Sequence, residues 1–349
     1  MMRAIVSGLL LGLVAPITAA AQAISLPELE QQIADRALGK IVAVQVEQNG
    51  ETVYAQRFDR KNDDQLTDIR SAGKSLTALA VGILVDEGKL PVNTNVWPLL
   101  GSAANDPRND ITVRDLLTMS SSLDCSDSTL KSPGNEERMY RTKVWRDFAM
   151  NIPVAGDYTR DDKGYGRFSY CTAGVFLLGQ VVEEVSGQRF DDFMAERVFR
   201  PLGIDDVKWT RSRSGEVQSG GQIQMRADDL LKIGRLVLDG GKYRGQQIVS
   251  GEWIKQMLQP HSQTGPYNYY GYLWWFSPVT SPRGLEPSWM MMGNGGNIIS
   301  IYREYDAVIV VQARNYNKDD AHPNSFAIMR AVLEALPAPN QKGDGSGAD

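Results

Sequence analysis

The chain has 349 residues, of which 42% are hydrophobic and 23% are charged, and its formal net charge is -5. This length corresponds to one large domain or two of ordinary size, and the composition is that of a soluble globular protein. The acidic balance and the absence of a basic run argue against nucleic acid or an anionic membrane surface as the main partner.

Residues 1–23 have the pattern of a signal peptide. Arg3 supplies a positive charge, residues 5–14 form an apolar run, and Ala21-Gln22-Ala23 fits a small-x-small cleavage site. We therefore expect a periplasmic or secreted chain that starts near Ile24 and has no integral membrane segment after signal removal. An uncleaved anchor is the alternative, although the apolar run is short for crossing a bilayer.

Export also bears on Cys125 and Cys171, the two cysteines of the chain. Thiols outside the cytoplasm are not kept reduced, so we predict that these residues form a disulfide. The alternative is a pair of separate buried thiols.

The segment after the signal predicts a helix, a β-hairpin and a second helix. The first helix is expected over residues 28–38, and strands are expected over 41–47 and 52–58, which are rich in β-branched residues. Asn49-Gly50 between them is a strong signal for a two-residue hairpin turn. Apolar residues with helical spacing then predict a helix that begins near Ser71.

Ser71 and Lys74 are three residues apart at the start of this helix, so they lie on one face of its first turns. A serine becomes a nucleophile when a base takes its proton, and a lysine can be that base if burial and neighbouring cations favour its neutral form. The N–H groups at the helix start favour negative charge beside Ser71. The alternative is an N-cap serine followed by an ordinary surface lysine.

Residues 71–222 show helices and long loops, without a convincing strand. The helices expected here cover 112–119, 172–185 and 190–199. Thr172 is a candidate cap for the second of these. Loops 120–141 and 156–166 are long for a compact domain, and such loops are often functional.

Beyond residue 227, helices and strands alternate again. The helices expected here cover 228–238, 252–258 and 325–336, and the strands cover 270–276, 289–292, 297–302 and 307–313. We predict an α/β (α+β) fold in which a sheet domain of residues 24–70 and 223–337 carries an inserted helical domain of residues 71–222. Residues 338–349 are expected to be a disordered tail. Ser71, at the junction of the two domains, would lie in the cleft between them.

Three short motifs now point to a family. The segments Ser71-Ala-Gly-Lys74, Tyr170-Cys-Thr172 and Gly293-Asn-Gly-Gly296, in this order, resemble the motifs of serine β-lactamases and penicillin-binding proteins. The similarity extends over about residues 59–336 and is greatest to the class C β-lactamases and their esterase and amidase relatives. The resemblance implies a β-lactamase-like fold, with an antiparallel sheet flanked by helices, a mostly helical second domain and the active site in the cleft.

The resemblance also implies a role for each motif residue. Ser71 would be the acylated nucleophile, Lys74 a base or proton shuttle, and Tyr170 the group that passes the proton to the leaving group and later activates water. The backbone N–H groups of Ser71 and Gly296 would form the oxyanion hole. The residues expected to contact substrate are Thr172, Gly293, Asn294 and Gly295.

Two positions depart from the family pattern. Class C enzymes have an amide where this chain has Thr172, and a lysine where it has Gly293. Without that cation a substrate carboxylate loses a partner, unless Arg303 or Arg314 replaces it. We therefore expect a serine hydrolase of small esters or amides, with a β-lactamase or D,D-peptidase as the alternative. A non-catalytic penicillin-binding sensor is the alternative from another class.

Neither histidine offers a different mechanism on sequence grounds. His261 and His322 have no second ligand at metal-binding spacing, so we expect no metal and no cofactor, and a small molecule as the substrate. A Ser-His-Asp triad would require one of these loop histidines to reach Ser71. The aromatic cluster at residues 267–275 is expected to pack in a strand and the core.

Overall fold

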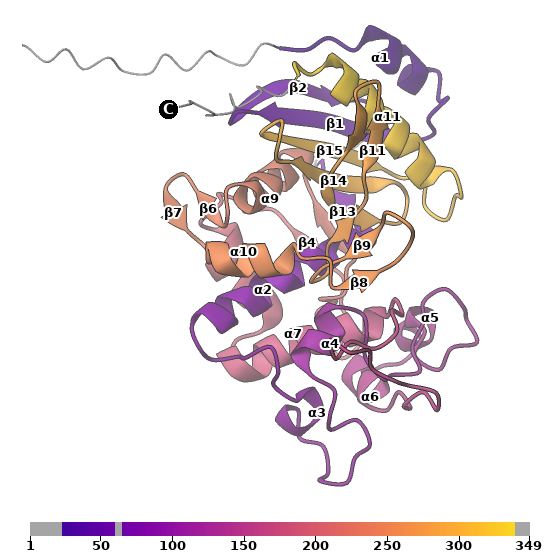
Figure 1. Cartoon of the computed structure of the whole chain (residues 1–349), viewed down its shortest axis with the longest axis vertical. Helices are drawn as coiled ribbons and strands as arrows, with labels where there is room; N and C mark the ends of the chain where they lie inside the picture. Colours follow the sequence, from indigo (N-terminus) through magenta and orange to yellow (C-terminus); the bar gives the residue numbers. More distant parts are fainter. Residues whose placement is uncertain (1–22, 60–64, 339–349) are drawn as a thin grey trace, which may run out of the picture.

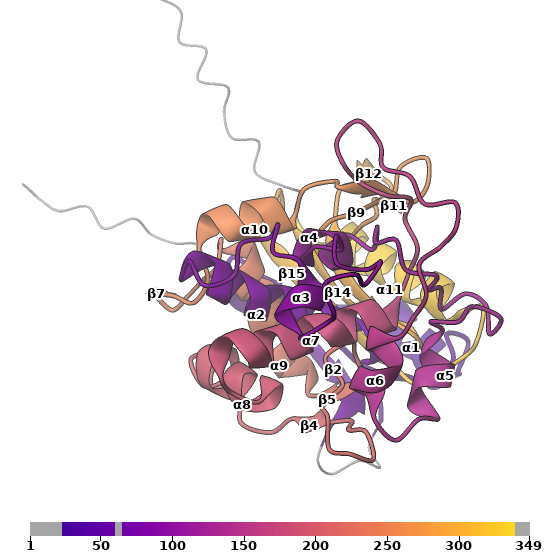
Figure 2. The same cartoon turned by 90° about the horizontal axis from the view of Figure 1, so that it is seen from below.

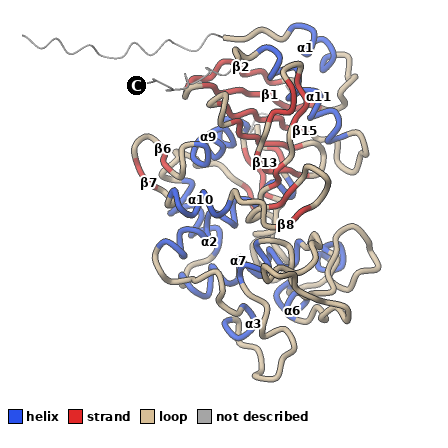
Figure 3. Tube along the Cα trace, in the orientation of Figure 1, coloured by secondary structure: helices blue, strands red, loops and turns tan. Residues whose placement is uncertain are grey.

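The computed structural model describes residues 23–59 and 65–338, so the proposed signal up to residue 22 and the tail from 339 lie outside the described residues. A mixed fold results, with an antiparallel sheet at one end of the molecule and helices with long loops at the other (Figure 1). Figure 3 separates the strand-rich part from the helix-and-loop part. The predicted fold class is confirmed.

The main sheet has eight strands in the order β2-β1-β15-β14-β13-β10-β9-β8. These strands are β1 (Ile41–Gln48), β2 (Glu51–Arg57), β8 (Ser262–Gln263), β9 (Tyr269–Tyr270), β10 (Trp275–Phe276), β13 (Trp289–Gly293), β14 (Asn297–Tyr302) and β15 (Ala307–Ala313). Since β1 pairs with β15, the two ends of the chain meet in one sheet. The predicted hairpin is confirmed, with Asn49 and Gly50 both at positive φ (53° and 79°), as a two-residue hairpin turn requires.

Successive side chains of the central strands point to opposite faces of the sheet, so each face packs in a hydrophobic core of its own. Val308 and Val310 pack in the cluster that includes α9 (Ala227–Leu238), whereas Ile309 and Val311 pack in the cluster that includes α11 (Ala321–Ala335). The helix α1 (Pro27–Ala34) contributes to the second cluster. Both faces are thus covered, which explains why these strands are apolar throughout.

The helical region lies below the sheet and is seen end-on in Figure 2. Its helices are η1 (Arg70–Gly73), α2 (Lys74–Asp86), α3 (Val96–Leu99), α4 (Val113–Leu117), α5 (Glu136–Tyr140), α6 (Trp145–Met150), α7 (Thr172–Ser186), α8 (Phe190–Met194) and η2 (Ala195–Phe199). Thr112 and Asp115 form the expected capping box of α4. The N-cap of α7 is Cys171 and not Thr172, which is the first helical residue, so that prediction was one residue out.

Three small sheets and the helix α10 complete the fold. The remaining elements are β3 (Thr67–Asp68), β4 (Lys208–Trp209), β5 (Ile223–Met225), β6 (Lys242–Tyr243), β7 (Gln246–Gln247), α10 (Gly251–Met257), β11 (Val279–Ser281) and β12 (Gly284–Glu286). The expectation of no strand within 71–222 was wrong, because β4 pairs with β5, which also pairs with β3. A two-residue strand is created by its partner, and local sequence preference does not reveal it.

The strand expected over 270–276 is interrupted. Gly271 donates its N–H to the Trp274 carbonyl (2.8 Å), and Leu273 has a φ of 59°, so a turn separates β9 from β10. Tyr270, Tyr272 and Trp274 are buried, which confirms the expected core packing of this cluster. In residues 23–59 and 65–338, no helix has the length and hydrophobicity needed to cross a bilayer.

Candidate active site

The start of α2 brings Ser71 and Lys74 together. Ser71 lies in the 3₁₀ turn η1, and Lys74 is the first residue of α2, so its Nζ reaches the Ser71 Oγ at 2.9 Å and donates to it. Lys74 is only 1% exposed. Because lysine is almost never fully buried without a partner, this placement points to a specific role in the cleft rather than to a surface lysine.

The residue before Ser71 holds a strained backbone conformation. Arg70 has a φ of 53°, in the left-handed region that a side chain other than glycine adopts at a cost of about 1–3 kcal/mol. Asp68 compensates, since its Oδ1 accepts from the Arg70 N–H (2.9 Å) and its Oδ2 pairs with the Arg70 Nε (3.1 Å). The guanidinium also lies 4.6 Å from the centre of the Tyr316 ring. These contacts fix the sharp turn that begins η1.

Tyr170 completes a triad of side chains with Ser71 and Lys74. The Ser71 side chain is one of the groups that act on its phenol, and the Tyr170 ring centre lies 4.9 Å from Lys74 Nζ. The Trp275 ring stacks on it at 5.7 Å and holds its orientation. Burial raises the pKa of Tyr170, while the charge of Lys74 and the hydrogen bond from Ser71 oppose this rise. Tyr170 is therefore a neutral phenol at rest, able to receive and return a proton.

The predicted disulfide between Cys125 and Cys171 is present, with a Cα–Cα distance of 5.5 Å. It joins the loop after α4 to the residue beside Tyr170. Close to it, the Ser169 Oγ donates to the Cys125 carbonyl (2.6 Å). The loop and the Tyr170 segment are thus tied together on both sides of the phenol.

Gly293 brings the third motif against the nucleophile's turn. A Cβ added at this position would lie 1.9 Å from the Ile69 carbonyl oxygen and 3.0 Å from the Ala72 N, so only glycine lets β13 approach η1 this closely. Gly295 and Gly296 follow with φ values of 91° and 87°, which strongly favour glycine. The motif therefore supplies backbone to the site.

Two predicted substrate-binding side chains have specific surroundings. The Asn294 side chain is exposed and engaged at both ends, because its Nδ2 donates to Asn317 Oδ1 (2.7 Å) and its Oδ1 accepts from Asn317 N (2.8 Å). Thr172 is buried, and its Oγ1 has no hydrogen-bond partner among the residues that the structure describes. Substrate contacts by both residues stay predictions.

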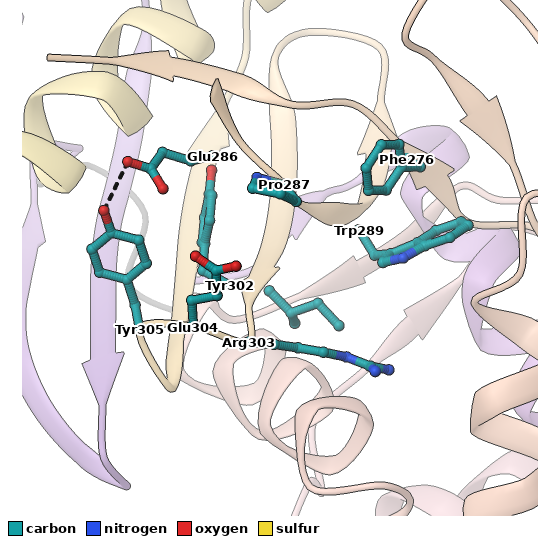
Figure 4. Close-up of a pocket in the computed structure, with 9 residues that line it drawn as sticks. Phe276, Glu286, Pro287, Trp289, Tyr302, Arg303, Glu304 and Tyr305 are labelled. Atoms are coloured by element: carbon teal, nitrogen blue, oxygen red, sulfur yellow. Dashed lines mark hydrogen bonds between the residues drawn. The ribbon is translucent and has the colours of Figure 1, made fainter. Parts of the chain in front are cut away.

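The two arginines considered as replacements for a lysine at 293 lie elsewhere. Arg314 pairs with Asp59 (2.6 Å) and donates to Leu66 and Thr67. Arg303 lines a cavity of about 200 Å³ beside Trp289, at the end of β13 and β14 opposite Gly293 (Figure 4). Neither cation takes the place of the absent lysine.

Both histidines have structural partners. His261 stacks on Tyr272 (4.3 Å), and its ring nitrogens lie 3.0 Å from Tyr165 Oη and 2.8 Å from the Gln256 carbonyl. His322 Nε2 lies 3.1 Å from the Gly293 carbonyl, behind the third motif. Burial lowers the pKa of both imidazoles. Neither ring contacts Ser71 within the described residues, so the geometry supports Lys74 and Tyr170 as its partners.

Sequence reasoning missed Asp127 and Glu136. Both carboxylates raise the pKa of Tyr170, and Asp127 also accepts a hydrogen bond from the backbone beside it. Neither belongs to a motif. The signal that could have found Asp127 is its position two residues after Cys125, whose predicted disulfide brings this loop to Tyr170.

The long loops enclose two cavities near this triad. One of about 470 Å³ is lined by residues of loop 120–141 together with Phe168 and Ser169, and it also contacts Lys131 and Arg167. The other, of about 420 Å³, shares Arg167 and Phe168 with the first and includes His261. Phe168 and Ser169 thus bring cavity-lining residues next to Tyr170 in the chain, and Lys131 and Arg167 supply positive charge to the first cavity.

Comparison with known proteins places this geometry in context. The family model described as Beta-lactamase matches residues 29–333. A 6-aminohexanoate-dimer hydrolase of Paenarthrobacter ureafaciens is 30% identical over 250 residues, covering 68% of this chain and 61% of the relative. Penicillin-binding protein 4 of Amycolatopsis lactamdurans is 31% identical over 137 residues, covering 38% of this chain and 33% of the relative. The matched region is thus less than two thirds of each relative's own length.

Solved structures show the same fold. A putative 6-aminohexanoate-dimer hydrolase from Bacillus anthracis has a TM-score of 0.70 at 19% identity, over 88% of this chain and 82% of that one. EstCE1, described as a hydrolase with promiscuous acyltransferase activity, has a TM-score of 0.68 at 17% identity, over 88% and 97%. At these identities the likeness shows the fold alone.

Proposed function

Since the chain belongs to the β-lactamase family, we propose that it is an exported serine hydrolase that acts through an acyl-enzyme on Ser71. The observation that carries this proposal is the contact of a buried lysine, Lys74, with the Ser71 hydroxyl at 2.9 Å, while the Tyr170 ring centre lies 4.9 Å from the same ammonium. The disulfide between Cys125 and Cys171 supports export, because such bonds persist in oxidising compartments.

In the first half of the reaction Ser71 Oγ attacks the substrate carbonyl carbon. Its proton passes to the unit formed by Lys74 and Tyr170, which accepts it after one proton of the unit has been released to solvent. The negative oxygen would be held by the N–H groups of Ser71 and Gly296. The position of Ser71 in η1 supports this role, because the first N–H groups of a helix have no hydrogen-bond partner within the helix.

Tyr170 then returns the proton to the leaving oxygen or nitrogen, and the bond from that atom to the carbonyl carbon breaks. In the second half a water molecule takes the place of the leaving group. The Lys74–Tyr170 unit removes its proton as it attacks the ester on Ser71, and the acid is released. The Tyr170 oxygen suits both steps, because it donates a proton as a phenol and accepts one as a phenolate.

We propose small, uncharged esters or amides as substrates. Gly293 offers no side chain at the position where a lysine would meet a carboxylate, and the space beside it is filled by the backbone of Ile69 and Ala72. The relative from Paenarthrobacter is named 6-aminohexanoate-dimer hydrolase, and EstCE1 is described as a hydrolase with promiscuous acyltransferase activity. These names support hydrolysis and acyl transfer at this site.

A β-lactamase or D,D-peptidase is the second candidate, and one observation favours it. Lys131 and Arg167 both line the cavity of about 470 Å³ beside Ser169. A substrate carboxylate that reached this cavity would meet positive charge without a lysine at 293. A non-catalytic penicillin-binding sensor has no need of the complete Ser71, Lys74 and Tyr170 arrangement.

Intact-protein mass spectrometry tests the proposal. The wild type and Ser71→Ala are each exposed to a fluorophosphonate and to a penicillin, and turnover of a neutral p-nitrophenyl ester is measured in parallel. We expect the fluorophosphonate adduct and ester turnover in wild type only. A tenth or more of the wild-type turnover in the alanine variant would identify another nucleophile, and a stable penicillin adduct without turnover would favour the sensor.

A further inference from the structure

Asp127 contacts the catalytic segment on both sides of Cys171. Its N–H donates to the Tyr170 carbonyl (2.9 Å), and its Oδ2 accepts from the Thr172 N–H (2.7 Å). The other carboxylate oxygen, Oδ1, accepts from the N–H of Glu136 at the start of α5 (3.0 Å). The Asp127 side chain therefore joins the backbone beside Tyr170 to the start of α5.

Charged and titratable groups on α2, on α5 and in the segment before α7 interact with Asp127. Lys74 on α2 is the cation that acts on it, and Glu136 on α5 acts with the opposite sign. Burial, with a contribution from Glu136, raises the pKa of Asp127 to about 6. Tyr170 before α7 and Tyr140 on α5 are the phenols that feel its charge, and both have raised pKa values.

Glu136 has its own partners within this group. Tyr140 Oη donates to Glu136 Oε2 (2.8 Å) and accepts from Gln218 Nε2 (3.1 Å). Glu136 is thus fixed beside Asp127, which feels the charges of both Glu136 and Lys74.

We propose that Asp127 is a positioning residue of this active site, whose carboxylate balances the charge of buried Lys74 while it fixes the backbone of Tyr170. The inference rests on the proposed function, because it assigns Asp127 to the proton-transfer unit of Ser71. It has two separable consequences. Loss of the backbone clamp lowers the maximal rate, whereas loss of the negative charge makes proton release from Tyr170 easier.

The second consequence is a shift along the pH axis, which a purely structural residue would not cause. Attack by Ser71 requires proton loss from this unit, so kcat/KM rises with pH through an apparent titration of the whole group. A carboxylate that faces the unit holds that midpoint high. In Asp127→Asn we expect the midpoint to fall by about one pH unit and the plateau to drop roughly 10-fold.

The experiment measures two quantities for full-length protein between about pH 5 and pH 10. These are kcat/KM on a neutral p-nitrophenyl ester and the rate at which a fluorophosphonate labels Ser71. Asp162→Asn is the control, because Asp162 is an exposed carboxylate that lines neither of the two cavities. We expect its profile to match that of wild type. An unchanged midpoint in Asp127→Asn, or an equal shift in Asp162→Asn, would overturn the proposal.

Two further variants keep the test decisive if Asp127→Asn does not fold, as judged by circular dichroism. Asp127→Glu retains the charge, so its midpoint should stay at the wild-type value even if its plateau falls. Glu136→Gln removes the second carboxylate and should lower the midpoint by a smaller amount than Asp127→Asn. A wild-type midpoint in Glu136→Gln would then refute the inference.

Failure of the proposed function gives a different result. Labelling of Ser71→Ala by the fluorophosphonate would remove Ser71 from the reaction altogether. Labelling that depends on Ser71, with a pH profile indifferent to Asp127 and Glu136, would leave the nucleophile in place and refute only the role of Asp127.

Discussion

The two sides of the candidate active site contribute different things. The helical side presents side chains, namely the Ser71 hydroxyl, the Lys74 ammonium and the Tyr170 phenol. The sheet side, residues 293–296, presents backbone, because a side chain at Gly293 has no space and the Asn294 amide is engaged by Asn317. Reactivity and shape are therefore specified by separate parts of the chain.

The two sides of the site also make different unfavourable contributions to the free energy of folding. The helical side buries a cation, which requires compensating negative charge and hydrogen bonds. The sheet side uses glycines at positive φ, which lose more conformational freedom on folding than other residues. Mutations should consequently fail in different ways on the two sides, through proton transfer on one and through geometry on the other.

The largest effect is expected from the helical side. Lys74→Ala and Tyr170→Phe should each lower kcat/KM by about three orders of magnitude or more, because both remove a member of one proton-transfer unit. The double variant should be little worse than either single one. Steady-state kinetics on a neutral ester provide the measurement, and Lys89→Ala, which alters an exposed lysine paired with Glu87, is the control. Additive losses would show that the two residues act in separate steps.

On the sheet side, Gly293→Ala should lower kcat/KM by roughly 100-fold, through displacement of β13 from η1. The added Cβ would meet the Ile69 carbonyl at 1.9 Å, so backbone has to move. Gly156→Ala is the matched control, since a Cβ there meets nothing within 4 Å. The comparison of the two sides would be wrong if Gly293→Ala kept more than about a third of the wild-type rate with an unchanged melting temperature.

The same geometry limits how far substrate preference can be redesigned. A lysine introduced at 293 cannot be accommodated while β13 stays against η1, so the absence of that cation is built into the packing. The family resemblance indicated that a lysine is missing at 293, but it could not show that the position has no room for one.

Local signals in the sequence were sufficient for much of the fold. The Asn49-Gly50 turn, the Thr112–Asp115 capping box and the spacing of Ser71 and Lys74 each depend on residues close together in the chain. The short strand β4 and the break between β9 and β10 were missed, because distant pairing and a tight turn decide them.

The features of the site also divide into those that the sequence could predict and those that depend on contacts between distant segments. The disulfide could be predicted from there being two cysteines and a predicted export signal. Asp127 was missed, although the predicted disulfide brought its loop to Tyr170, because its role depends on which groups surround it in the folded protein. Contacts between segments that are distant in sequence leave no periodic pattern to detect.

A smaller effect on activity is expected from removal of the disulfide between Cys125 and Cys171, next to Tyr170. Replacing both Cys125 and Cys171 with alanine removes a cross-link between residues 46 apart, which in the chain-entropy model contributes about 4 kcal/mol to the free energy of unfolding. Urea denaturation measures this loss. We expect the folded variant to keep about a tenth of the activity, because Asp127 still holds the Tyr170 backbone.

The control for the disulfide is reduction. Dithiothreitol should lower the stability of wild type and leave the double alanine variant unchanged. Two reactive thiols in unreduced, denatured wild type would show that the bond does not form, and wild-type stability in the alanine variant would show that it contributes nothing.

The smallest effect is expected at Thr172, where stability and activity should change in opposite directions. Its side chain is buried and its Oγ1 has no hydrogen-bond partner in residues 23–59 and 65–338, and an unsatisfied buried hydroxyl typically costs about 1–3 kcal/mol. Thr172→Val keeps the shape and removes the hydroxyl, so the free protein should become more stable by up to about 1 kcal/mol. If substrate is the missing partner, kcat/KM should fall by about 5-fold at the same time. Asn294→Ala is the comparison, because its amide is already engaged by Asn317 and its loss should change KM by less than about 3-fold. Lower stability in Thr172→Val with unchanged kinetics would instead identify a structural partner, such as a buried water molecule, and would remove Thr172 from the substrate contacts on the helical side.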